Sequence, residues 1–89
     1  MACYIVTFEV KDPAKLTSLI EGLKSYGSYC PVNASTWAII TSNTAVQIRD
    51  HLMSLIDIND RLFVVRSGAE AAWRNAYGQV HTDWLKKYL

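Results

Sequence analysis

The stretch from Leu55 to Val65 constrains the fold of this chain more than any other part. It ends an amphipathic helix, passes through a polar turn at residues 57–60 and runs directly into an apolar strand at residues 61–66. Asp and Asn are typical of such a turn because their short side chains bond to nearby backbone groups. Helix, turn and strand in immediate succession predict a small fold in which helices pack on a sheet.

The N-terminal part supplies a first strand and a first helix. Apolar residues alternate with other residues over 3–10, which predicts a strand with one well-buried face. Asp12 and Pro13 then form a strong helix start, a carboxylate cap followed by proline at the first helical position. Apolar residues recur at helical spacing after it and Gly27 offers a stop; the apolar positions are Leu16, Leu19, Ile20 and Leu23.

Two further strands and a second helix complete the pattern. Residues 29–33 predict an edge strand because Pro31 cannot donate to a ladder, and residues 36–41 predict the next strand. Thr44 and Gln47 have the spacing of a capping box at the start of the second helix. That helix carries an apolar stripe of Ile48, Leu52, Leu55 and Ile56.

The resulting order β-α-β-β-α-β predicts a ferredoxin-like α+β sandwich. It has a four-stranded antiparallel sheet with two helices on one face. We expect one domain over 1–89, with a core at 1–67 and an apolar C-terminal docking segment at 68–89 that contains a short helix near 80–88. The first strand is apolar on both faces. The face without helices must therefore be covered by a second subunit or by the tail of the chain.

Charge and cysteine content narrow the classes of function. The net charge is +1, which gives no global electrostatic argument for binding nucleic acid or membranes. Residues 61–89 carry five Lys/Arg against two Asp/Glu, so a local basic patch is permitted. Cys3 and Cys30 are interpreted as buried free thiols of a protein in a reducing compartment. With no signal peptide and no apolar span of membrane length, we expect a cytoplasmic protein without a membrane partner.

Several short motifs carry a resemblance to a known family. Phe8-Glu9 ends the first strand, Ser35-Thr36-Trp37 opens the third, and the helix-turn-strand of 48–65 follows in the family order. On these motifs the chain resembles the prokaryotic CRISPR-associated Cas-two superfamily. Trp73 and the segment Asp83-Trp84-Leu85-Lys86 make it most similar to the stand-alone SinR-like proteins. The resemblance implies homodimers whose open sheet faces pack together, often with a C-terminal segment crossing to the partner.

The resemblance also suggests a chemistry for Glu9. Nuclease-competent relatives hold an Asp at this position, which binds a divalent metal with its two-fold mate. Two carboxylates on one Mg²⁺ or Mn²⁺ could activate water for attack on a phosphodiester. Glutamate is one methylene longer, and Mg²⁺ demands tight octahedral geometry. We therefore interpret Glu9 as a carboxylate at the rim of the sheet and keep a catalytic metal ligand as the alternative. No other cofactor is expected.

The remaining polar and aromatic candidates receive structural interpretations. His51 and His81 stand alone, without a second ligand at metal spacing. Trp37 and Trp73 are expected in the core or an interface, with base stacking as the alternative. The candidate nucleic-acid-binding residues are Arg66, Arg74, Lys86 and Lys87.

The leading functional hypothesis is a non-catalytic homodimeric scaffold or interaction module, with nucleic acid as a candidate partner. One alternative is a divalent-metal-dependent endonuclease that uses Glu9 from both subunits. Another is a partner-binding protein of a mobile-element or toxin–antitoxin system, which follows from the resemblance alone.

Overall fold

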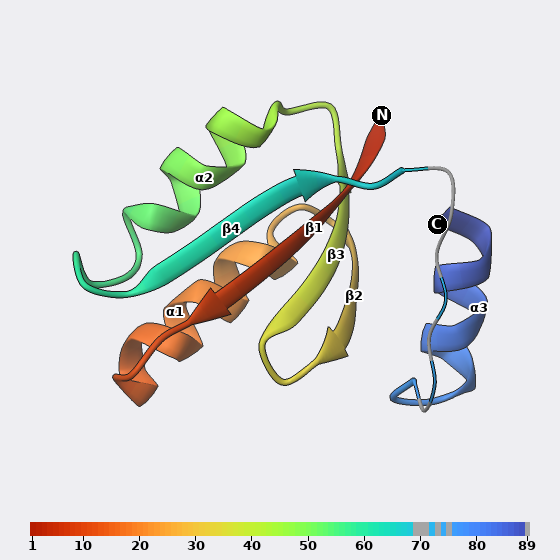
Figure 1. The fold of residues 1–89 in the computed structure, drawn as a ribbon, viewed down its shortest axis with the longest axis horizontal. Helices are drawn as coiled ribbons and strands as arrows, with labels where there is room; N and C mark the ends of the chain where they lie inside the picture. The colour runs from red at the N-terminus through yellow and green to blue at the C-terminus, as the bar shows by residue number, and fades with distance from the viewer. Residues whose placement is uncertain (69–71, 73, 75, 89) are drawn as a thin grey trace.

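The computed structural model describes residues 1–68, 72, 74 and 76–88, and these form an antiparallel sheet with three helices (Figure 1). The elements in chain order are β1 (Ala2–Glu9), α1 (Pro13–Lys24), β2 (Ser28–Asn33), β3 (Thr36–Thr41), α2 (Ala45–Met53), β4 (Arg61–Arg66) and α3 (Gln79–Tyr88). The strand order is β2-β3-β1-β4, and each neighbouring pair is antiparallel. The predicted ferredoxin-like arrangement is confirmed, with β2 at an edge as Pro31 indicated.

Both predicted helix starts are confirmed in detail. The Asp12 carboxylate accepts a hydrogen bond of 2.9 Å from the Ala14 amide, and Pro13 occupies the first turn. The Thr44 hydroxyl accepts from the Gln47 amide at 3.2 Å, while the Gln47 side chain accepts from the Thr44 amide at 2.9 Å. This reciprocal capping box satisfies two amide donors that a helix start would otherwise leave free.

The predicted end of the second helix is wrong by one turn. α2 ends at Met53, so Leu55 and Ile56 belong to the turn rather than to the helical stripe. The Leu55 amide donates to the Leu52 carbonyl at 3.0 Å, which tightens the last turn and stops the helix. Both residues still pack against the core as half-buried side chains. The apolar character of these two residues therefore predicted their burial correctly, although they lie in the turn after the helix.

The core lies between α1, α2 and one face of the sheet. Its buried side chains are Tyr4, Val6 and Phe8 of β1, Trp37 and Ile39 of β3, Leu19 and Leu23 of α1, and Ile48 and Leu52 of α2. Gly22 lies where α1 meets the chain after α2: a Cβ built there would come within 2.6 Å of the Leu55 Cδ1 atom. The glycine in the last turn of α1 is thus explained by close packing.

The third helix lies apart from the other two. α3 packs against β2 (Figure 1). Its bounds, Gln79–Tyr88, nearly match the short helix predicted near residues 80–88. Leu85 is its buried side chain. The part of the tail that forms α3 therefore docks on its own chain.

Candidate functional site

The sheet face turned away from α1 and α2 shows a gradient of exposure. The strand registers place Cys30 of β2, Ala38 of β3, Ile5 of β1 and Val65 of β4 in one cross-strand row on this face. Cys30 and Ala38 are fully buried, Ile5 is half-buried and Val65 is 43% exposed. The face is thus covered at its β2 side and open at its β4 side.

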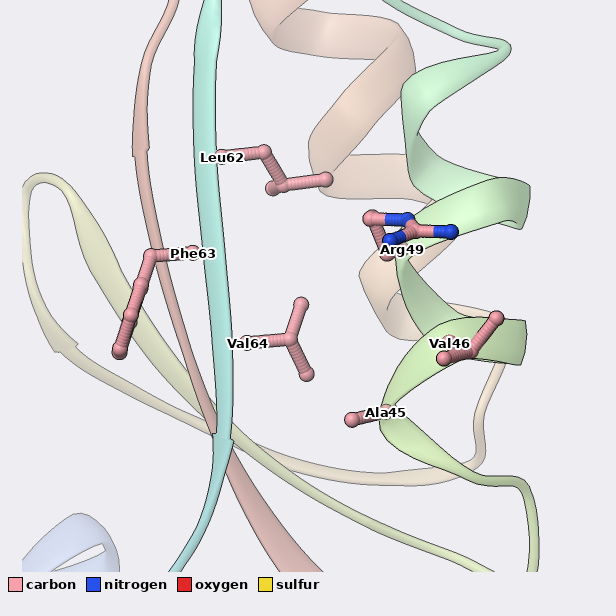
Figure 2. A pocket seen from close by; sticks show the side chains of 6 residues that line it. All are labelled: Ala45, Val46, Arg49, Leu62, Phe63 and Val64. Atoms are coloured by element: carbon pink, nitrogen blue, oxygen red, sulfur yellow. The ribbon is translucent and has the colours of Figure 1, made fainter.

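Phe63 extends the open side of this face. It pairs with Thr7 in the register of β1 and β4, and its side chain is 60% exposed. Figure 2 shows Phe63 pointing away from Leu62 and Val64, which point toward α2. We call the group Ile5, Thr7, Phe63 and Val65 the open half-face. The strands of an antiparallel sheet with one solvated face normally place polar residues on that face. Phe63 and Val65 are therefore unusual as exposed apolar side chains on the open half-face.

The covered side holds a contact that the sequence did not reveal. The Cys30 Sγ atom lies 3.6 Å from His81 Nδ1 and 3.8 Å from the His81 carbonyl oxygen. His81 has no second ligand at metal spacing in the sequence, but α3 brings it into contact with a thiol 51 positions away. Cys3 and Cys30 are buried free thiols, as predicted. Burial raises the pKa of both, so both remain neutral at ordinary pH.

These raised pKa values predict a loss of stability at alkaline pH. An unfolded thiol ionises near its ordinary pKa of 9.0, whereas the buried thiols stay protonated above it. The contribution of the two neutral thiols to the free energy of unfolding is fully present below pH 9.0. It declines above that pH and is lost as the pH rises through the pKa values of the folded state. Urea unfolding between about pH 8 and about pH 10.5 measures this decline. The double variant Cys3→Ala/Cys30→Ala is expected to decline less steeply, and equal slopes would contradict the assignment.

Glu9 lies at the end of β1, with its side chain exposed. Its register partner in β4 is Arg61, which is also exposed. The alternation of β1 places Glu9 on the same side of the sheet as Ile5 and Thr7, at the rim of the open half-face. Among the residues that the structure describes, no group of three or more His, Cys, Asp or Glu side chains could hold a metal ion.

The candidate nucleic-acid-binding residues are exposed but come from separate elements. Arg66 pairs with Tyr4, about 17 Å along the strand from Glu9 at the usual rise per residue. Lys86 and Lys87 project from α3, and the Lys87 Nζ atom lies 5.3 Å from the centre of the Tyr88 ring. Arg74 precedes that helix in a bend. The structure thus places Glu9 and Arg66 at opposite ends of the β1–β4 pair.

The two predicted aromatic candidates have different outcomes. Trp37 belongs to the core between the sheet and the helices, which confirms its structural interpretation. Trp73 lies outside the described residues. His51 is exposed, as predicted, and its Nδ1 atom lies 2.8 Å from the Tyr26 hydroxyl.

A shallow groove runs between α2 and β4 (Figure 2). It has a volume of about 220 Å³ and is lined by Ala45, Val46, Arg49, Leu62, Phe63 and Val64. Arg49 is its titratable side chain, and its guanidinium nitrogen lies 3.0 Å from an Asp50 carboxylate oxygen. A lining of aliphatic and aromatic groups with one ion-paired arginine provides neither a nucleophile nor a general base. The lining residues of this groove therefore provide no catalytic group.

Comparison with known proteins supports the fold. No protein-family model matches the chain. A crystal structure of a hypothetical protein, TT1823 from Thermus thermophilus, superposes with a TM-score of 0.70 at 21% identity, covering 84% of this chain and 92% of that one. At this identity the likeness shows a shared small α+β fold. Among the described helices, none is long and apolar enough to cross a bilayer.

Proposed function

We propose that this protein is a non-catalytic scaffold that self-associates through the open half-face. The observation that carries this proposal is the exposure of Phe63 at 60% and Val65 at 43% beside the half-buried Ile5. Burial of apolar area is favourable by about 25 cal/mol per Å², and an aromatic ring has the largest area to bury. A second copy of the same face supplies a complementary apolar surface.

Self-association also suits the symmetry and the charges of this surface. Most homodimers use the same patch on both subunits, so the same residues meet near the two-fold axis and the centre of the patch must not carry charges that repel each other. The open half-face is uncharged, while Glu9 and Arg61 stand at its rim as a pair of opposite sign. An apolar centre with a charged rim is the usual composition of an interface. The proposal assigns Glu9 to that rim and gives it no catalytic role.

Site-specific photo-cross-linking tests the proposal. p-Benzoylphenylalanine is placed at position 63 of the full chain, and irradiation is expected to give a covalent product of twice the 10.0 kDa monomer mass. Position 58 is the matched control, because Ile58 is an apolar residue that is 97% exposed in the turn before β4. Equal yields from the two positions would show random encounter and would contradict the proposal.

A further inference from the structure

α3 is held on the sheet by few buried side chains. Over its ten residues, Leu85 is the one that is buried, at 1% exposed, whereas Val80 is 78% exposed. α1 buries three residues and α2 buries two. Elements with few buried apolar contacts open at a lower free energy than the rest of a fold. α3 is therefore weakly docked compared with the two helices of the core.

The contact beneath α3 adds little to its docking. Cys30 is fully buried, and its Sγ atom lies 3.6 Å from both His81 Nδ1 and the Pro31 carbonyl oxygen, an ordinary distance for a hydrogen bond from a thiol. A neutral thiol is a weak donor. Leu85 is therefore the buried apolar side chain of the docked helix, and Cys30 is a buried group of the sheet that α3 contacts.

The position of α3 connects it to the open half-face. Cys30 and Ala38 share a cross-strand row with Ile5 and Val65, so α3 covers one end of the same face whose other end is exposed. With α3 docked, a second copy reaches only the open half-face. With α3 displaced, the apolar row is continuous from β2 to β4.

We propose that α3 is a removable cover that limits self-association of the sheet face. Release of α3 exposes Cys30 and Ala38 and enlarges the surface on which a second copy packs. This inference rests on the proposed function, since it concerns the same face and the same partner. It assigns the C-terminal helix a regulatory role that its weak docking makes feasible.

Leu85→Ala tests the cover in the full chain. The expected result is alkylation of Cys30 by N-ethylmaleimide at least roughly tenfold faster than in the wild type, as judged by peptide mass mapping, because loss of a buried leucine favours the undocked helix. Sedimentation velocity should show dimerisation at several-fold lower concentration. Val80→Ala is the control on the same helix and should change neither quantity. Unchanged labelling of Cys30 in Leu85→Ala would overturn the inference.

A locked helix provides the opposite test. His81→Cys places a thiol next to Cys30, and mild oxidation should join the two residues and fix α3 on the sheet. The oxidised protein is expected to dimerise more weakly than the same protein after reduction. Equal dimerisation before and after reduction, with the disulfide confirmed by mass, would overturn the cover.

A third comparison separates the two proposals. Phe63→Asp in the Leu85→Ala background should restore the monomer. Two outcomes would refute both the proposed function and the cover. In the first, dimerisation survives Phe63→Asp; in the second, the wild type and Leu85→Ala both remain monomeric. A different outcome would refute the cover alone. In that outcome Leu85→Ala speeds labelling of Cys30, but dimerisation keeps its wild-type strength and still depends on Phe63.

Discussion

Replacing Ile39 with alanine is expected to lower the free energy of unfolding by about 2–5 kcal/mol. Ile39 is fully buried in β3, where its register neighbours are Tyr4 of β1 and Tyr29 of β2. The substitution removes apolar atoms from the core and leaves a cavity that its neighbours fill only in part, and both effects destabilise. For a chain this short, such a loss is a large part of the total stability.

Urea unfolding followed by circular dichroism measures this change. Ile58→Ala is the matched control: it is the same substitution at a residue 97% exposed. Its effect is expected to stay within about 0.5 kcal/mol. If both variants lose the same stability, the assignment of Ile39 to the core is wrong.

Local patterns were sufficient to predict the fold. The caps at Asp12 and Thr44 and the proline in β2 act over a few residues, so the sequence states them directly. The end of α2 was predicted one turn too late. Leu55 continues the helical spacing of apolar residues, but it is buried from a turn, and periodicity alone does not distinguish these two cases.

The candidate site was less predictable because it depends on contacts between distant segments. The first strand indicated that the second face of the sheet needs a cover, yet the alternation of apolar residues does not say how far the tail reaches. The structure places α3 over Cys30 and leaves Phe63 and Val65 open. The proximity of Cys30 and His81, 51 positions apart, had no signal in the sequence.

Phe63→Asp is expected to abolish self-association at micromolar concentrations. Full burial of a phenylalanine contributes about 1.5–3 kcal/mol; an interface gains the part of this that belongs to the 60% of Phe63 still exposed in the monomer, and a symmetric interface gains it twice. The substitution also places two carboxylates against an apolar surface, where unpaired charges are costly. Together these effects should raise the dimer Kd at least about 100-fold. The monomer should stay folded, because Phe63 is 60% exposed and lies outside the core.

Sedimentation velocity across a concentration series is the measurement that tests the central claim most directly. It compares the wild type with Phe63→Asp and with the control Ile58→Asp, which adds the same charge in the exposed turn. The account predicts a concentration-dependent dimer for the wild type and for Ile58→Asp, and a monomer for Phe63→Asp. A wild type that remains monomeric throughout, or a Phe63→Asp protein that dimerises as strongly as the wild type, would contradict it.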